Sequence, residues 1–187
     1  NMSGIGVVYI PWIRTGGTLV LHHPFDLELL IEQLEVEAID FTILVPTVLS
    51  RILKHDDVDS FDLSGIETIA TGSDTPATWA LKEFNDRWGI DIINIWGQNE
   101  GTYLLSTPAT TPIERRSTDF PLFDSDHKWN VDHTPTAAHT RVKLVDPDTR
   151  DELPEKPGKV GELAFRGPIT MTEYFNQPEY TNTAFDD

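Results

Sequence analysis

Short apolar runs alternate with helical segments between Asp26 and Trp96, and this alternation constrains the fold more than any other feature. Residues 41–45 form a short, mostly apolar run of the kind found in buried parallel strands. Asp26 can cap a helix whose apolar side chains share one face. The pattern predicts strands at 18–21, 41–45, 66–70 and 90–96, and helices at 27–37, from Pro46 onward and at 78–88. We therefore expect an α/β fold with a mostly parallel sheet flanked by helices.

The character of the chain changes after Leu105. Residues 106–139 are rich in Thr, Pro, Asp and His without periodicity, which indicates a loop-rich connection. Two strands follow, at 140–145 and 160–166, with a turn cluster between them. We expect an α/β subdomain over 1–105 and a β-rich antiparallel segment over 140–187.

The charge of the chain limits its partners. Its 31 acidic and 14 basic residues give a net charge of −17, which repels nucleic acid and anionic membranes. Such an acidic surface resembles that of halophilic proteins, because molar salt shortens the Debye length to about 3 Å and screens the repulsion. We therefore expect stability to fall at low salt.

The composition also bears on the cellular compartment. The chain has no cysteine, which excludes disulfides, thiolate metal sites and a cysteine nucleophile. No signal peptide is visible, and the apolar run Ile5–Ile13 is too short to span a bilayer. A cytoplasmic protein without a membrane span is the expectation.

Two predicted strands end in loops suited to a ligand. Thr71–Pro76 follows one of them and Trp96–Thr102 the other. Ligands of open α/β sheets bind at the carboxyl ends of the strands, so neighbouring strands would bring these loops together across a cleft. Gly72 and Gly97 would let the backbone approach a ligand, and Glu100 could hold Mg²⁺ on a phosphate.

The order of these motifs resembles the adenylate-forming superfamily, and acyl-CoA synthetases in particular. The family's aromatic-Gly-x-Thr-Glu motif corresponds to Trp96–Glu100, and its adenine-lining loop corresponds to Gly72–Thr75. Its Gly-Glu-Leu strand and Arg-Gly turn correspond to Gly161–Pro168. The ending Tyr174–Glu179 also resembles the family, so the likeness extends over essentially the whole chain.

The resemblance implies a reaction in two halves. A carboxylate attacks the α-phosphate of ATP and releases pyrophosphate, and a thiol, typically that of CoA, then displaces AMP. By similarity, Glu100 binds Mg²⁺ and is catalytic together with Asn99, which stands where the family has a Thr that contacts the α-phosphate. The residues implied for ATP are Gly72, Ser73, Asp74, Trp96, Gly97 and Gln98, and those implied for the acyl pocket are Gly101 and Thr102. Fatty acid metabolism is the implied setting.

Parts of the family pattern have no match in this sequence. The family's phosphate loop and its C-terminal domain with a catalytic Lys are missing, so the chain resembles an internal piece of the large N-terminal domain. We expect it to be inactive alone. Two alternatives stay open: an adenylation domain that loads a carrier-protein thiol, and a non-catalytic nucleotide-binding domain, which is kept because Asn99 departs from the family pattern.

Other polar clusters favour plain structural roles. His127, His133 and His139 lie near acidic residues, but their spacing matches no compact metal motif, so solvated loop positions are expected. Arg115 and Arg116 could pair with a phosphate, although a surface role is the simpler interpretation.

Overall fold

The structure is a computed structural model that describes residues 4–121, 141–154, 156 and 158–185. Its chain forms two compact units. Unit 1 comprises Asn1–Gly97 and Leu104–Pro121, and unit 2 comprises Gln98–Tyr103 and Leu122–Asp187. His127, His133 and His139, for which solvated loop positions are expected, lie outside the described residues. Most of the predicted loop-rich connection lies outside them too.

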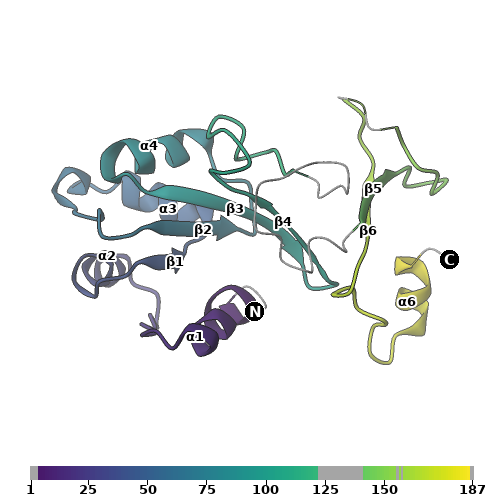
Figure 1. The fold of residues 1–187 in the computed structure, drawn as a ribbon, viewed down its shortest axis with the longest axis horizontal. Coiled ribbons are helices and arrows are strands. Elements are labelled where there is room, and N and C mark those ends of the chain that lie inside the picture. Colours follow the sequence, from purple (N-terminus) through teal and green to yellow (C-terminus); the bar gives the residue numbers. More distant parts are fainter. Residues whose placement is uncertain (1–3, 122–140, 155, 157, 186–187) are drawn as a thin grey trace. The chain divides into compact units, whose positions relative to one another are not determined.

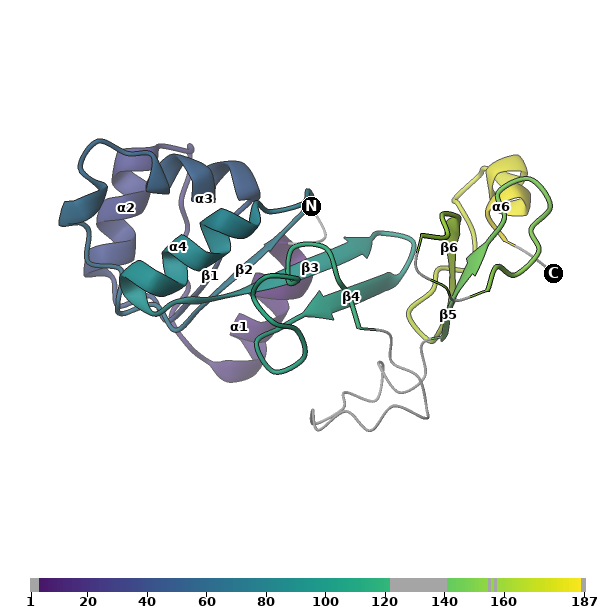
Figure 2. The same ribbon diagram turned by 90° about the horizontal axis from the view of Figure 1, so that it is seen from above.

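A four-stranded sheet organises unit 1, with the strand order β1-β2-β3-β4. Its strands are β1 (Phe41–Ile43), β2 (Thr68–Gly72), β3 (Asp91–Gln98) and β4 (Thr102–Ser106). The pairs β1–β2 and β2–β3 are parallel. Figure 2 shows β3 and β4 running in opposite directions. The expected mostly parallel sheet is therefore confirmed.

Helices α2 (Leu27–Val36), α3 (Pro46–Leu53) and α4 (Thr78–Trp88) lie together on one face of this sheet (Figures 1 and 2). Asp26 caps α2, because its Oδ1 accepts a hydrogen bond of 3.0 Å from the Leu29 N–H. The apolar faces of the three helices pack with side chains of β2 and β3 into one core. All three helices were predicted at or within a residue of these positions.

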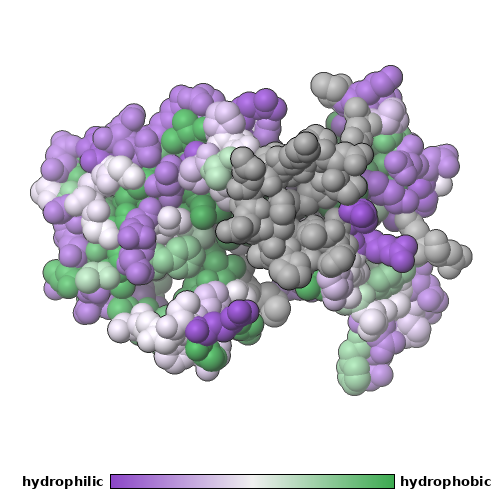
Figure 3. Space-filling model, in the orientation of Figure 1, coloured by the Kyte–Doolittle hydropathy of each residue, from purple (hydrophilic) through white to green (hydrophobic). Residues whose placement is uncertain are grey.

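The start of unit 1 differs from the prediction. The strand predicted at 18–21 does not form, and Leu21 in this run is 76% exposed, so the run packs against no sheet. Instead, a six-residue π-helix (Gly4–Tyr9) leads into α1 (Ile10–Thr15). Several of their apolar side chains are exposed, and Figure 3 shows hydrophobic residues on the surface there.

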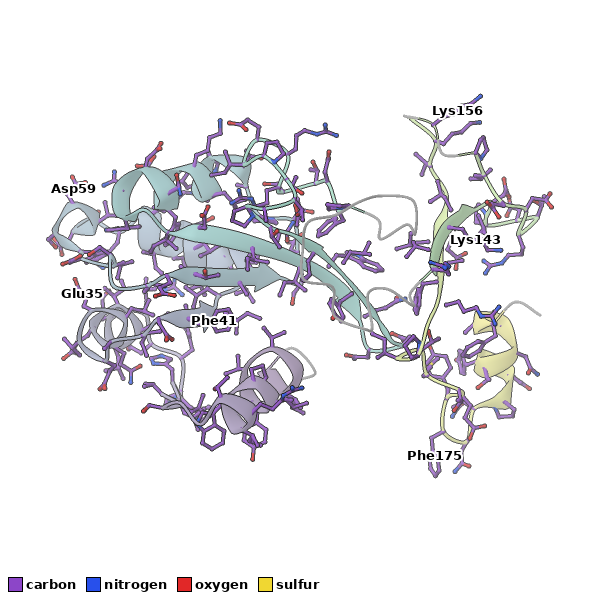
Figure 4. All side chains as sticks on the ribbon, in the orientation of Figure 1. Glu35, Phe41, Asp59, Lys143, Lys156 and Phe175 are labelled. Carbon is purple, nitrogen blue, oxygen red and sulfur yellow. The ribbon has the colours of Figure 1, made fainter. Side chains whose placement is uncertain are left out.

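Unit 2 contains an antiparallel pair, β5 (Arg141–Val145) and β6 (Glu162–Arg166), which confirms the predicted hairpin-like arrangement. Lys143 lies on β5 (Figure 4). The turn after β5 is closed by Asp146, whose carboxylate accepts hydrogen bonds from the backbone N–H groups of Asp148 and Thr149. A helix that the sequence did not predict, α6 (Pro178–Ala184), ends the described chain.

No helix among the described residues is both long enough and apolar enough to cross a lipid bilayer.

Candidate active site

The loop after β2 begins at a glycine that its neighbouring strand requires. Gly72 pairs with Ile95 of β3, and a Cβ on Gly72 would lie 2.5 Å from the Ile95 carbonyl oxygen. Ser73 follows with φ +72°, and the Asp74 carboxylate accepts a hydrogen bond of 2.7 Å from the Thr75 N–H. Ser73 and Asp74 are exposed, so their polar groups are open to a ligand at this edge of the sheet.

A polar layer lies within unit 1 beside this loop. Thr71 and Asn94 are register partners on β2 and β3 and are almost fully buried. The Asn94 amide donates hydrogen bonds to the carbonyl oxygens of Arg116 and Ser117, at 3.1 and 3.0 Å. The Thr78 hydroxyl, at the start of α4, donates to the Ser117 hydroxyl at 3.0 Å. The segment after β4 is thereby fastened to the sheet and to α4.

Arg116 secures the same segment from within. Its side chain is 5% exposed, and its Nη1 donates to the Asp91 carboxylate at 3.2 Å and to the Ile92 carbonyl at 3.3 Å. The surface role predicted for Arg116 is therefore wrong, because these β3 acceptors draw the guanidinium inside. Arg115 is exposed, as predicted, and pairs with Asp119.

The strand β3 carries the central motif. Trp96 is half-buried near its end, and the following Gly97 and Gln98 are exposed. Asn99 and Glu100 form the turn before β4, with Asn99 exposed and Glu100 half-buried. The parallel strand β2 ends at Gly72, which pairs with Ile95, whereas β3 continues to Gln98, so Trp96, Gly97 and Gln98 lie in the strand and not in the predicted loop. The Thr102 backbone begins β4, and its side chain lies outside the described part.

The structure divides the predicted site residues between the two units. Unit 1 contains Gly72–Asp74, Trp96 and Gly97, and unit 2 contains Gln98–Thr102. Within unit 2 the turn meets a partner that the sequence did not identify. The Tyr174 hydroxyl donates a hydrogen bond of 2.9 Å to Glu100 Oε1. This bond, followed by burial, raises the pKa of the Tyr174 phenol above its usual value of 10.0.

Gly101 is required by the backbone that it contacts. Its φ is +117°, and a Cβ there would overlap the carbonyl oxygen of Ile169. The adjacent Glu100 carbonyl accepts a hydrogen bond of 2.8 Å from the Met171 N–H. The glycine therefore has a packing reason of its own, and the acyl-pocket role of Gly101 and Thr102 stays a prediction.

The donor set suits a magnesium ion that is bound through a nucleotide. The described residues contain no group of three or more His, Cys, Asp or Glu side chains able to hold a metal by themselves. Mg²⁺ commonly binds one or two carboxylates together with phosphate oxygens and water. Glu100, a single half-buried carboxylate on a turn, fits such a site.

Comparisons with known proteins show the family to which the chain is similar. A family model described as "AMP-binding enzyme" matches residues 2–175. Indoleacetate–CoA ligase of Aromatoleum aromaticum is 27% identical over 94% of this chain and 31% of its own length. Nonribosomal peptide synthetase 7 of Aspergillus fumigatus is 31% identical over 94% of this chain and 6% of its own length.

Solved structures share the fold. ATP-bound MatB from Rhodopseudomonas palustris superposes with a TM-score of 0.71 at 18% identity, covering 100% of this chain and 33% of that one. The chain thus spans about a third of the length of the CoA ligase and of the solved structure that it matches. The match over residues 2–175 includes both strand-end loops and the segment that meets Glu100, and on this ground the chain belongs to the family of AMP-binding enzymes.

Proposed function

We propose that the protein containing this chain is an ATP-dependent acyl-CoA synthetase. A carboxylate oxygen of the substrate acid attacks the α-phosphorus of ATP, the bond to pyrophosphate breaks, and acyl-AMP forms. The CoA sulfur then attacks the acyl carbon, AMP leaves and the thiol proton passes to solvent. The observation that carries the proposal is the AMP-binding family match together with a turn that holds Glu100.

The chain's own residues would bind and orient ATP. The backbone of Gly72–Asp74 and the ring of Trp96 are proposed to flank adenine, with Gly97 and Gln98 beside them. Asn99, exposed on the turn, would donate its amide N–H to the α-phosphate. The Glu100 carboxylate would hold Mg²⁺, which when bound offsets the repulsion between the two anionic reactants. Gly101 and Thr102 would border the acyl group.

The test is a screen of the full-length protein. Pyrophosphate release is followed with a panel of aliphatic and aromatic carboxylic acids, with and without CoA. We expect acid-dependent release that requires Mg²⁺ and falls by about a hundredfold in Glu100→Gln, the size of effect seen on losing one transition-state charge contact. Release with none of the acids would refute the proposal. The 187-residue chain alone should form no acyl-AMP.

A second acceptor is worth testing, since the chain is 31% identical to a nonribosomal peptide synthetase. In this alternative the acyl group passes to the thiol of a carrier protein. CoA or a phosphopantetheine-bearing carrier protein is added to the acyl-AMP formed in the screen. The thiol that accepts the acyl group faster identifies the class of enzyme. A cytoplasmic location, where ATP and CoA are available, is part of the same proposal.

A further inference from the structure

A hydrogen bond within unit 2 joins Glu100 to Tyr174, 74 positions apart in sequence. We propose that Tyr174 is a positioning residue, which holds the Glu100 carboxylate in the orientation that binds magnesium–ATP. This inference rests on the proposed function and extends it. Its basis is the 2.9 Å hydrogen bond from the Tyr174 hydroxyl to Glu100 Oε1.

Both partners of this bond are fixed through their backbones. The Glu100 carbonyl accepts the Met171 N–H at 2.8 Å, and the next residue, Gly101, packs on the backbone at Ile169. At the other end, the Tyr174 N–H donates to the Thr181 hydroxyl on α6 at 2.9 Å. The phenol is thus held at a defined distance from the turn.

The segment leading to Tyr174 is itself closed by a turn. The Thr170 N–H donates to the Gly167 carbonyl, and the Gly167 N–H donates back to the Thr170 hydroxyl, both at 3.1 Å. The neighbouring Phe175 is 85% exposed and points away from this segment (Figure 4). Of this adjacent aromatic pair, only Tyr174 faces the turn, and its hydroxyl is the group that reaches the carboxylate.

The hydrogen bond is compatible with metal binding. A carboxylate offers about four acceptor sites on two oxygens, so one phenol leaves sites for a cation. A free glutamate side chain loses much rotamer freedom when it binds a metal. Tyr174 has already restricted that freedom, which should strengthen magnesium–ATP binding.

The experiment measures ATP affinity of the full-length protein by calorimetry, with Mg²⁺ and with EDTA. We expect Tyr174→Phe to weaken binding of magnesium–ATP by about tenfold, the effect of one hydrogen bond to a charged group, and to leave metal-free ATP binding unchanged. Tyr180→Phe is the matched control, because Tyr180 is 68% exposed and makes no hydrogen bond through its hydroxyl in the described part of unit 2. This control should bind both forms as wild type does.

A double-mutant cycle tests whether Tyr174 acts through Glu100. In a Glu100→Gln background, Tyr174→Phe should have little further effect on magnesium–ATP affinity. Hydrogen exchange at the Met171 amide should remain slow in Tyr174→Phe, which shows that the turn is still folded.

The outcomes separate the two proposals. Unchanged or tighter magnesium–ATP binding in Tyr174→Phe, or additive effects in the cycle, would overturn the role of Tyr174 alone. A wild-type protein whose ATP affinity does not respond to Mg²⁺ would instead overturn the proposed role of Glu100.

Discussion

Replacing Gly101 with alanine should destabilise the turn that carries Glu100. Two costs combine. A residue with a side chain at φ +117° carries backbone strain of about 1–3 kcal/mol. Overlap of the new Cβ with the Ile169 carbonyl forces a backbone shift, which costs about 1–3 kcal/mol more. We therefore expect a total of about 2–6 kcal/mol.

Gly158→Ala is the matched control for this prediction. Gly158 also has a positive φ, +83°, but a Cβ there would meet nothing within 4 Å. The control carries the strain alone, so the difference between the two variants in the free energy of unfolding isolates the overlap.

Hydrogen exchange at the Met171 amide reports the effect locally, because that N–H donates to the Glu100 carbonyl. The local cost of about 2–6 kcal/mol should lower its protection in Gly101→Ala by roughly thirtyfold or more relative to Gly158→Ala, whose strain lies at another turn. Equal protection in the two variants would refute the argument that Gly101 is required by its contact with Ile169.

Three further predictions concern other parts of the chain. Arg116→Met should lower the free energy of unfolding in urea by about 2–3 kcal/mol, because the acceptors of the buried guanidinium lose their hydrogen-bond donor. The exposed neighbour Arg115→Met should cost under about 1 kcal/mol, and equal costs would contradict the account. The melting temperature should rise between dilute buffer and molar KCl, because salt screens the net charge of −17; an unchanged value would exclude the halophilic interpretation. The backbone N–H groups of Thr149, then Asp148, hold the pKa of the Asp146 carboxyl below its usual 3.8. The stabilisation they provide is present above that usual value and is lost as pH falls through the lower folded pKa. An NMR titration of Asp146 with a midpoint at or above 3.8 would contradict this.

The sequence predicts the sheet of unit 1 well because its signals are local. A continuous apolar run at 41–45 and an amphipathic stretch at 78–88 each identify an element without reference to the rest of the chain. Parallel pairing then follows from the helices between the strands, and β1, β2 and β3 are indeed parallel neighbours.

The elements that are not predicted from the sequence depend on a neighbouring segment of the folded chain. The run at 18–21 has strand-like residues but no neighbouring strand, whereas β4 is short and exists because β3 lies beside it. The charge of Arg116 likewise leads to a wrong prediction of its exposure. A second arginine in a polar stretch reads as a surface residue, and only the folded chain supplies the Asp91 and Ile92 acceptors that bury it.

The candidate site shows the same limit. Glu100 is recognisable from its motif and the segment at Tyr174 resembles the family, but nothing in the sequence shows that these positions, 74 apart, are in contact. Their hydrogen bond depends on the backbone turn at Gly167–Thr170 and on the hydroxyl of Thr181, neither of which leaves a periodic signal.

The division of the chain has a consequence for how proteins of this kind can exchange parts. Unit 2 includes Gln98–Tyr103, a short stretch flanked on both sides by sequence of unit 1. A single recombination crossover between two related genes therefore cannot swap either unit whole. A crossover that falls between the two segments would join a Glu100-bearing turn from one parent to the Tyr174 segment of the other. Hybrid proteins that keep both segments from one parent should preserve the pairing, and crossovers between Glu100 and Tyr174 should be the ones selected against.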